Sequence, residues 1–170
     1  MKDEVTIRKY NPKTDKEHLF EIWYENNQNQ ISDEAEIEQY RDTFNHLLQY
    51  VDGSFEIFVA VLNNEVIGYQ SALPIRNNPL FWREHAVSST FVKKKYQSGG
   101  TGYNLLKRML KHLPDSNITL FFGQTQTSNT TMISVGKKLG FKKIGVIPIS
   151  NKESLNNELV LYVYNVPKNK

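Results

Sequence analysis

Three of the chain's nine glycines lie within four residues, at Gly99, Gly100 and Gly102. The residues before them, 86–92, are rich in small and β-branched side chains and predict a strand. The residues after them, 103–113, place leucine and methionine at helical spacing and predict an amphipathic helix. This order constrains the fold strongly, because a strand, a glycine-rich turn and a helix form the general architecture of a phosphate-binding turn.

Such a turn binds phosphate mainly through the backbone. Glycine lets the chain fold tightly and brings N–H groups close to a ligand, and the helix N-terminus adds unpaired donors and a positive dipole end. The P-loop pattern G-x-x-x-x-G-K-[ST] does not occur in the chain. A dinucleotide fingerprint beginning at Gly100 would need a glycine where Leu105 stands, so that motif is excluded as well.

Helical periodicity recurs in three further segments. Thr14 and Glu17 form a capping-box pattern before one helix, and a second helix begins near Asp33. The third helix is expected over 130–139, with Gly140 as its C-terminal cap.

The remaining segments have the composition of strands. Asparagine tolerates positive φ, so Asn63 and Asn64 predict a tight hairpin. Further strands are expected over 5–10, 55–62, 65–75, 118–125, 143–149 and 159–166. This order predicts an α+β fold in a single domain over 1–170, with a mixed, mostly antiparallel central sheet of about seven strands flanked by four helices.

Composition excludes several classes of protein. The chain is 39% hydrophobic and 23% charged, as is typical of a globular domain and not of a disordered or fibrous one. It has no cysteine, which excludes a disulfide framework, a thiolate metal site and a cysteine nucleophile. No apolar run approaches the roughly 20 residues that span a bilayer. The charged N-terminus does not resemble a signal peptide, so we expect a cytoplasmic protein.

The net charge of +3 is modest for a nucleic-acid-binding protein. Basic residues gather in the second half of the chain, at 93–95, 137–138 and 142–143. These lysines favour an anionic ligand held by that half, and their alternative role is that of a solvated surface.

The segment 97–102 reads Q-x-x-G-x-G, with Tyr96 directly before it and Val92 at the end of the predicted strand. This segment resembles the acetyl-CoA loop of the GNAT superfamily of N-acetyltransferases, [QR]-x-x-G-x-[GA]. The family commonly has a strand-ending valine before this loop and an aliphatic pair on the helix after it, here residues 105–106.

A second segment, NTTMISVGKKLGF, supports the same resemblance. It is similar to the family pattern N-x-x-(small)-x-x-(aliphatic)-Tyr-x-Lys-x-Gly-Phe. The residues that match in register are Asn129, Val135, Lys138, Gly140 and Phe141. The resemblance covers the whole chain in the order of its elements, and individual residues only over about 92–141.

The resemblance implies an acyl-CoA N-acyltransferase fold with acetyl-CoA as cosubstrate. Backbone groups of Phe91 and Val92 would bind the pantetheine arm, and Asn129 would contact it or order the turn before its helix. The lysines at 93–95 would lie near the adenosine 3′-phosphate. The backbone N–H groups that hold the pyrophosphate would come from Gln97, Ser98, Gly99, Gly100, Thr101, Gly102 and Tyr103.

The chain departs from the family at its catalytic positions. Gly136 stands where the family often has a tyrosine that acts as general acid, so no acid is assigned. A general base would deprotonate the acceptor amine. The candidate is Glu84, acting through water at the start of the strand that precedes the glycine turn, and its alternative role is that of a solvated residue. The neighbouring His85 is expected to be packed or at the surface.

Metal and acceptor sites have weaker signals. Three histidines on predicted helices have no ligand spacing, so we expect no metal site; they are His18, His46 and His112. Four aromatic residues are candidates for the wall of an acceptor pocket, with core or rim packing as the alternative; they are Trp23, Tyr24, Phe81 and Trp82.

The leading interpretation is an N-acetyltransferase that moves an acetyl group from acetyl-CoA to a primary amine of a small molecule or peptide by direct attack. One alternative is a non-catalytic acyl-CoA sensor on the same fold. It is favoured by Gly136 and by the lack, within residues 86–92, of the carboxylate that many members of the resembled family use as a base on this strand. The other is a nucleic-acid-binding module, which the lysine clusters favour. In the leading interpretation we expect no nucleic-acid or membrane partner, and family members are often homodimers.

Overall fold

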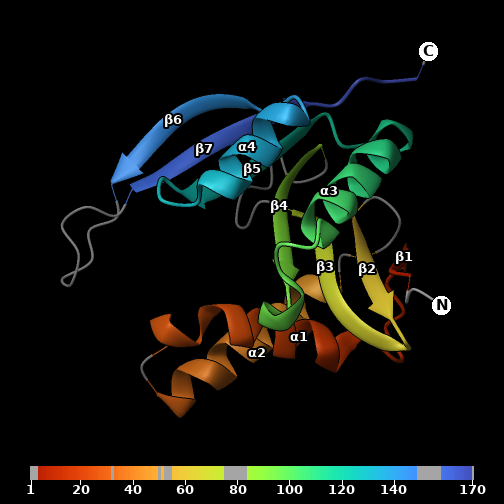
Figure 1. Ribbon diagram of the computed structural model, residues 1–170, viewed down its shortest axis with the longest axis vertical. Helices are drawn as coiled ribbons and strands as arrows, with labels where there is room; N and C mark the ends of the chain where they lie inside the picture. The colour runs from red at the N-terminus through yellow and green to blue at the C-terminus, as the bar shows by residue number, and fades with distance from the viewer. Residues whose placement is uncertain are drawn as a thin grey trace.

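The computed structural model describes residues 4–31, 33–49, 51, 55–74, 84–148 and 158–169. These residues form seven strands and four α-helices (Figure 1). The helices are α1 (Lys16–Asn27), α2 (Glu34–Leu48), α3 (Thr101–His112) and α4 (Thr130–Lys138). The strands are β1 (Thr6–Lys9), β2 (Glu56–Leu62), β3 (Glu65–Pro74), β4 (His85–Val92), β5 (Leu120–Gln126), β6 (Lys142–Pro148) and β7 (Glu158–Asn165).

All seven strands join one sheet in the order β1-β2-β3-β4-β5-β7-β6. Every pairing is antiparallel except that of β4 with β5, which is parallel and is connected by α3. The β2–β3 hairpin turns at Asn63 and Asn64, whose φ angles are 49° and 65°. The predicted α+β fold, its mixed sheet and its parallel crossover are therefore confirmed.

The parallel pairing of β4 with β5 is short. It covers three positions, which are His85 with Leu120, Ala86 with Phe121 and Val87 with Phe122. Beyond them β4 continues to Val92 and β5 to Gln126 without a further register pair between the two strands. The sheet therefore divides into two halves that separate along the second half of β4.

The two faces of β4 are covered by different helices. A Cβ placed on Gly102 of α3 would lie 3.6 Å from Thr90 and 3.8 Å from Val92, so these side chains point toward α3. Phe91 points to the opposite face, because successive side chains alternate along a strand. There its ring lies 5.5 Å from Tyr69, which in turn contacts Phe44 of α2 at 6.4 Å.

The start of α1 differs from the capping-box prediction. The N-cap residue is Asp15, not Thr14, and its side chain is 1% exposed. Its carboxylate accepts two hydrogen bonds from Arg8 and one from the Asn11 amide. Burial alone would raise the pKa of Asp15, but the hydrogen bonds from Arg8, Asn11 and Thr14 lower it below its usual value. The capping-box interpretation was wrong because a buried ion pair orders this turn instead.

Candidate active site

The glycine turn leads into α3 with a left-handed backbone at two positions. Ser98 has φ 69° and Gly100 has φ 81°. Gly100 is the N-cap of α3 and gives no side-chain cap, and the helix begins with the bond from the Asn104 N–H to the Gly100 carbonyl at 3.0 Å. The N–H groups of Thr101, Gly102 and Tyr103 are thus donors at the open end of the helix. Residues 97–100 are exposed, so this end is accessible to an anion.

Gln97 fixes the turn to the sheet through its side chain. Its Nε2 donates to the Val92 carbonyl at 3.0 Å and to Asn26 Oδ1 at 2.9 Å. Asn26 of α1 donates to the same carbonyl at 3.1 Å. The backbone N–H of Gln97 donates to Lys94. Within the segment 97–103, which was predicted to bind pyrophosphate, two roles can therefore be distinguished. The side chain of Gln97 anchors the turn, and residues 101–103 provide the N–H donors at the helix N-terminus.

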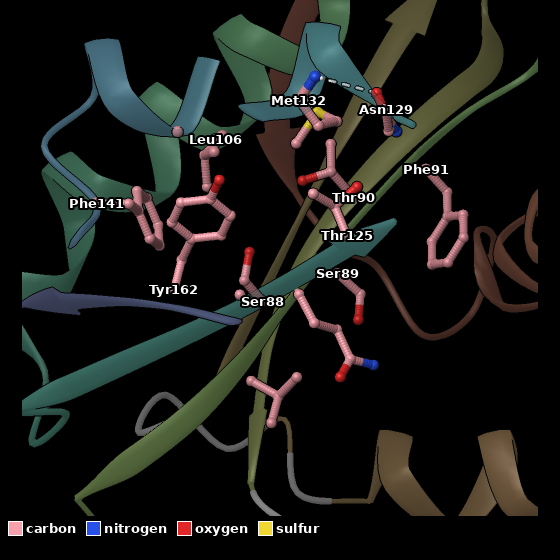
Figure 2. Close-up of a pocket in the computed structure, with 14 residues that line it drawn as sticks. Ser88, Ser89, Thr90, Phe91, Leu106, Thr125, Asn129, Met132, Phe141 and Tyr162 are labelled. Atoms are coloured by element: carbon pink, nitrogen blue, oxygen red, sulfur yellow. Dashed lines mark hydrogen bonds between the residues drawn. The ribbon is translucent and has the colours of Figure 1, made fainter. Parts of the chain in front are cut away.

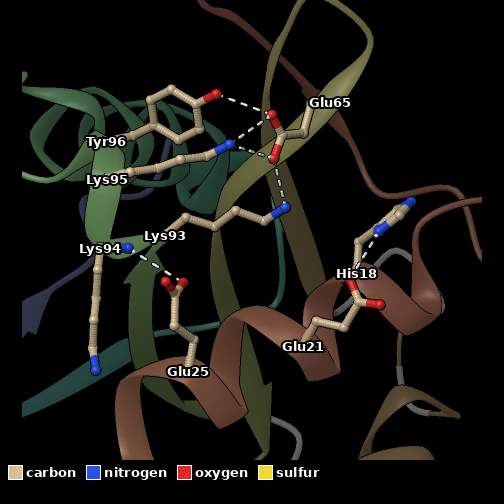
Figure 3. A network of polar contacts seen from close by, with 8 residues as sticks. All are labelled: His18, Glu21, Glu25, Glu65, Lys93, Lys94, Lys95 and Tyr96. Carbon is tan, nitrogen blue, oxygen red and sulfur yellow. Dashed lines mark hydrogen bonds and ion pairs between the residues drawn. The ribbon is translucent and has the colours of Figure 1, made fainter.

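Two of the three lysines before the turn are held by one acid. Glu65, in the β2–β3 hairpin, accepts hydrogen bonds from Lys93 Nζ at 2.7 Å, Lys95 Nζ at 3.2 Å and the Tyr96 hydroxyl at 2.9 Å (Figure 3). These bonds, the one from Lys93 first, lower the pKa of Glu65 from 4.5 to about 2. The side chain of Lys94 extends away from this cluster (Figure 3), so it is the best placed of the three to meet a phosphate.

The register of β3 and β4 decides which backbone groups face the gap. The Lys93 N–H donates to the Ile67 carbonyl at 2.8 Å, and Phe91 lies opposite Tyr69. Because backbone direction alternates along an antiparallel ladder, the groups of Phe91 face β3, and those of Thr90 and Val92 face the β5 side. Val92 is thus suitably placed to bind pantetheine. Thr90, which was not predicted from the sequence, is placed better for this than Phe91.

A cavity of about 270 Å³ lies where β4 and β5 separate (Figure 2). Consecutive residues from Val87 to Phe91 line it along β4. Its other walls come from α3, β5, α4, β7 and the residues that flank α4. They are Leu106, Gly123, Gln124, Thr125, Asn129, Met132, Gly136, Phe141 and Tyr162.

Gln70 of β3 orients two hydroxyls at the edge of this cavity. The Gln70 side chain is fully buried, and its Nε2 donates to the Ser71 carbonyl at 2.8 Å and to Ser88 Oγ at 3.0 Å. Thr90 Oγ1 donates to Gln70 Oε1. Because Ser88 accepts from Gln70, its own hydrogen is left to donate, whereas Thr90 offers lone pairs. Gln70 therefore makes the Ser88 hydroxyl a donor and the Thr90 hydroxyl an acceptor toward the cavity.

Asn129 lies at the start of α4 and lines the cavity. Its Oδ1 accepts from the Met132 N–H at 3.1 Å, which makes it the N-cap of the helix. This contact corresponds to the turn-ordering role that the family resemblance implied.

Glu84 is not brought to the cavity. It is exposed, and its backbone carbonyl accepts from the Thr119 N–H at 2.7 Å at the paired end of β4 and β5. The ring of His85 packs on Phe122 at 5.8 Å. Neither residue is among those that line the cavity, so the structure gives Glu84 no support as a base.

The predicted acceptor aromatics divide into two groups. Trp23 packs between helices, with ring centroids 5.7 Å from Phe20 and 5.0 Å from Tyr40. Tyr24 is half-buried on α1, and Phe81 and Trp82 lie outside the described residues. Within the described ranges there is no group of three or more histidines and acids able to hold a metal ion. The helices described here also include none with the length and apolar character needed to cross a membrane.

A sheet that separates between two parallel strands, beside a glycine turn at a helix N-terminus, has a geometry suited to an extended phosphate-bearing ligand. The model of the acetyltransferase (GNAT) family matches residues 16–141, and the chain belongs to this family. A search of curated protein sequences finds no significant match.

Solved structures share the fold at low sequence identity. A protein described as a phosphinothricin N-acetyltransferase superposes with a TM-score of 0.80 at 18% identity, over 97% of this chain and 100% of that one. The Salmonella typhimurium acetyltransferase yncA, solved with acetyl-CoA, gives 0.77 at 18%, over 97% and 95%. The ribosomal-protein-alanine N-acetyltransferase of Brucella melitensis gives 0.77 at 19%, over 94% and 99%. At these identities the comparison establishes the acyl-CoA N-acyltransferase fold.

Proposed function

We propose that the chain transfers an acetyl group from acetyl-CoA to a primary amine by direct attack of the amine nitrogen on the thioester carbonyl. The observation that carries this proposal is the continuity between two features. The open N-terminus of α3 presents the N–H groups of residues 101–103, and the gap beyond it exposes the backbone of Thr90 and Val92. A pyrophosphate and an extended amide-bearing arm need these two surfaces in this order.

The assignment of residues follows from that order. The glycine turn at 98–100 and the first N–H groups of α3 hold the pyrophosphate. The backbone of Thr90 and the Val92 N–H pair with the pantetheine arm, as a neighbouring strand would, while the Val92 carbonyl stays bonded to Gln97 and Asn26. Asn129 keeps the start of α4 against the cavity. Acetyl-CoA itself supplies the activated acyl group.

The proton lost by the acceptor amine passes to water in this proposal. Among the described residues that line the cavity there is no carboxylate and no imidazole, and Glu84 lies outside it. An acceptor that is already partly neutral at the working pH suits such a site, because it needs no positioned base. The ribosomal-protein-alanine N-acetyltransferases among the similar structures make peptide N-termini one class to test.

The lack of a carboxylate and an imidazole in the described cavity lining also favours a second candidate function, a protein that binds acyl-CoA as a sensor without turnover. Release of free CoA thiol from acetyl-CoA separates the two functions, measured over a panel of polyamines, amino acids, aminoglycosides and peptide N-termini. Release that depends on an acceptor supports the enzyme. Tight binding of acetyl-CoA with no release on any acceptor supports the sensor.

The cofactor site is tested with a matched pair of variants, Gly100→Asn and Gly140→Asn. Both glycines have positive φ, 81° and 90°, where asparagine is tolerated better than other residues, so both changes have a similar effect on folding. A Cβ at Gly100 has no protein atom within 4 Å and projects into the space assigned to phosphate. We expect Gly100→Asn alone to weaken CoA binding by about tenfold or more in calorimetric titration, since one lost phosphate contact is worth about 1.4 kcal/mol.

Gly140→Asn serves as the control, because it caps the far end of α4 and lies outside the cavity lining. Equal CoA affinity in the two folded variants would contradict the pyrophosphate assignment. Failure of the wild-type protein to bind CoA at millimolar concentration would contradict both candidate functions.

A further inference from the structure

We propose that the hydroxyl of Tyr162 donates the proton that the CoA sulfur takes up when the thioester breaks. This inference rests on the proposed acetyl transfer and assigns a catalytic residue to it. Tyr162 lies on β7, far in the sequence from the glycine turn and from α4, and it lines the cavity between β4 and β5.

The position of the Tyr162 side chain would let its hydroxyl donate a hydrogen bond to a ligand in the cavity. The residue is 6% exposed, and its ring stands opposite Gly123 of β5 in the sheet register. Figure 2 shows its ring beside Phe141 and its hydroxyl directed toward Leu106 of α3. Among the described residues no hydrogen bond is made by this hydroxyl, and it is not one of the buried atoms left without a partner, so it is open to a ligand in the cavity.

Two glycines, one on β5 and one on α4, also line the cavity. Gly123 and Gly136 contribute no side chain to it. A Cβ on Gly136 would lie 3.8 Å from the Cβ of Phe141, and one on Gly123 would lie 3.7 Å from the Phe141 ring. Both positions could therefore hold a small side chain, and their glycines leave more of the cavity open to a ligand.

The residues that line the cavity offer few candidates for a proton donor. Fourteen of the described residues line the cavity, and among these Tyr162 is the one whose side chain can act as a general acid. Ser88 can donate a hydrogen bond but is a poor proton source, because alkoxide formation is far less favourable than phenolate formation. Tyr162 is therefore the described group that can both reach into the cavity and release a proton.

The neutral amine nitrogen forms a bond to the thioester carbonyl carbon, the C–S bond breaks, and its electron pair stays on sulfur. The proton of the Tyr162 hydroxyl moves to that sulfur and gives the CoA thiol. The nitrogen loses one proton to water, and the phenolate regains one from water, so the net products are the amide and free CoA.

The test compares Tyr162→Phe with Tyr164→Phe. Both tyrosines lie on the same face of β7 and next to Phe141, whose ring centroid is 5.4 Å from that of Tyr164, but Tyr164 is outside the cavity lining. Each change removes one hydroxyl and keeps the ring, so folding is retained and is checked by the melting temperature.

The first measurement needs no acceptor. Binding of CoA and of desulfo-CoA is titrated for the wild-type protein and both variants. A hydrogen bond between the Tyr162 hydroxyl and the sulfur predicts that the ratio of the two affinities changes by about fivefold in Tyr162→Phe. The ratio is expected to stay at its wild-type value in Tyr164→Phe.

The second measurement uses any acceptor that gives thiol release. We expect kcat of Tyr162→Phe to fall by about 100-fold with little change in KM for acetyl-CoA, and kcat of Tyr164→Phe to stay near its wild-type value. An unchanged affinity ratio or an unchanged kcat would overturn the role of Tyr162 while CoA binding upheld the proposed function. Absence of CoA binding in the wild-type protein would overturn the proposed function, and the inference with it.

Discussion

At the scale of single residues, the site is ordered by side chains that do not themselves face the ligand space. Gln70 is fully buried in the middle of the sheet and determines which of two neighbouring hydroxyls donates and which accepts. Its amide orientation is fixed, because Nε2 donates to the Ser71 carbonyl, which can only accept. Gln97 acts in a similar way on the turn, through the Val92 carbonyl and Asn26.

Replacing Gln70 by leucine is expected to destabilise the fold by about 1–3 kcal/mol, because the buried Ser71 carbonyl and the Ser88 and Thr90 hydroxyls lose their partner. CoA affinity should fall severalfold, since both hydroxyls become free to rotate. Urea unfolding and calorimetric titration measure the two effects. Gln126→Leu, the same change at an exposed residue of β5, is the control and should leave both nearly unchanged. Equal unfolding midpoints for the two variants would show that Gln70 does not organise this edge.

The residues that the sequence predicted are those whose role is local. Gly100 was predicted from the strand and helix on either side of it, and Asn129 from the helix that follows it, and both lie at those caps. Gln70 and Tyr162 act across strands on residues 18 or more positions away, and neither belongs to a local pattern. Gly68 is similar, because a Cβ there would meet the Phe91 carbonyl at 2.9 Å, a contact that only the pairing of β3 with β4 creates.

At the scale of elements, the β2–β3 hairpin supports the glycine turn through Glu65. That carboxylate joins the hairpin to Lys93, Lys95 and Tyr96, three residues that lead into the turn. Its lowered pKa means that folding favours the charged form, so its stabilising contribution is complete above the unfolded value of 4.5 and is lost as the pH falls through about 2. The basic cluster before the turn is thus a structural clamp as well as a source of positive charge.

Glu65→Gln is expected to be less stable than the wild-type protein above pH 5, with a difference that shrinks between pH 4.5 and 2 as the wild-type carboxyl becomes protonated. Urea midpoints measured from pH 7 to pH 2 for both proteins test this. Glu158→Gln, at the exposed start of β7, corrects for the loss of one negative charge. A constant difference between wild type and Glu65→Gln down to pH 2 would show that the Glu65 charge does not hold the clamp.

The elements themselves were largely predictable, because strand and helix periodicities are local signals. All four helices and all seven strands appear in the predicted order. The start of α1 could not be predicted in this way, because Arg8 of β1 pairs with Asp15 and this long-range ion pair overrides the local pattern of Thr14 and Glu17. The separation of β4 from β5 was not predicted from the sequence either, since both strands are long enough to pair along their full length.

At the scale of the whole molecule, the cavity exists because two half-sheets meet over three residue pairs and then separate. Strands β1 to β4 form one half, and β5, β7 and β6 form the other (Figure 1). The glycine turn belongs to the first half, while Asn129 and Tyr162 lie with the second. A ligand that contacts all of these residues would bridge the two half-sheets along the part of β4 and β5 where the strands do not pair.

Hydrogen exchange followed by mass spectrometry tests this consequence of the fold. Without ligand, the amides of Thr90 and Val92 face the gap and should exchange faster than those of Ser89 and Phe91, which face the β3 ladder. CoA is expected to slow exchange at residues 88–92 and in the glycine turn, because its arm and pyrophosphate would take these donors. The pairing of β1 with β2 serves as the internal control, since it lies at the far edge of the sheet. Uniform slowing over the whole chain, or none along the second half of β4, would contradict a ligand that lies in the gap between the two half-sheets.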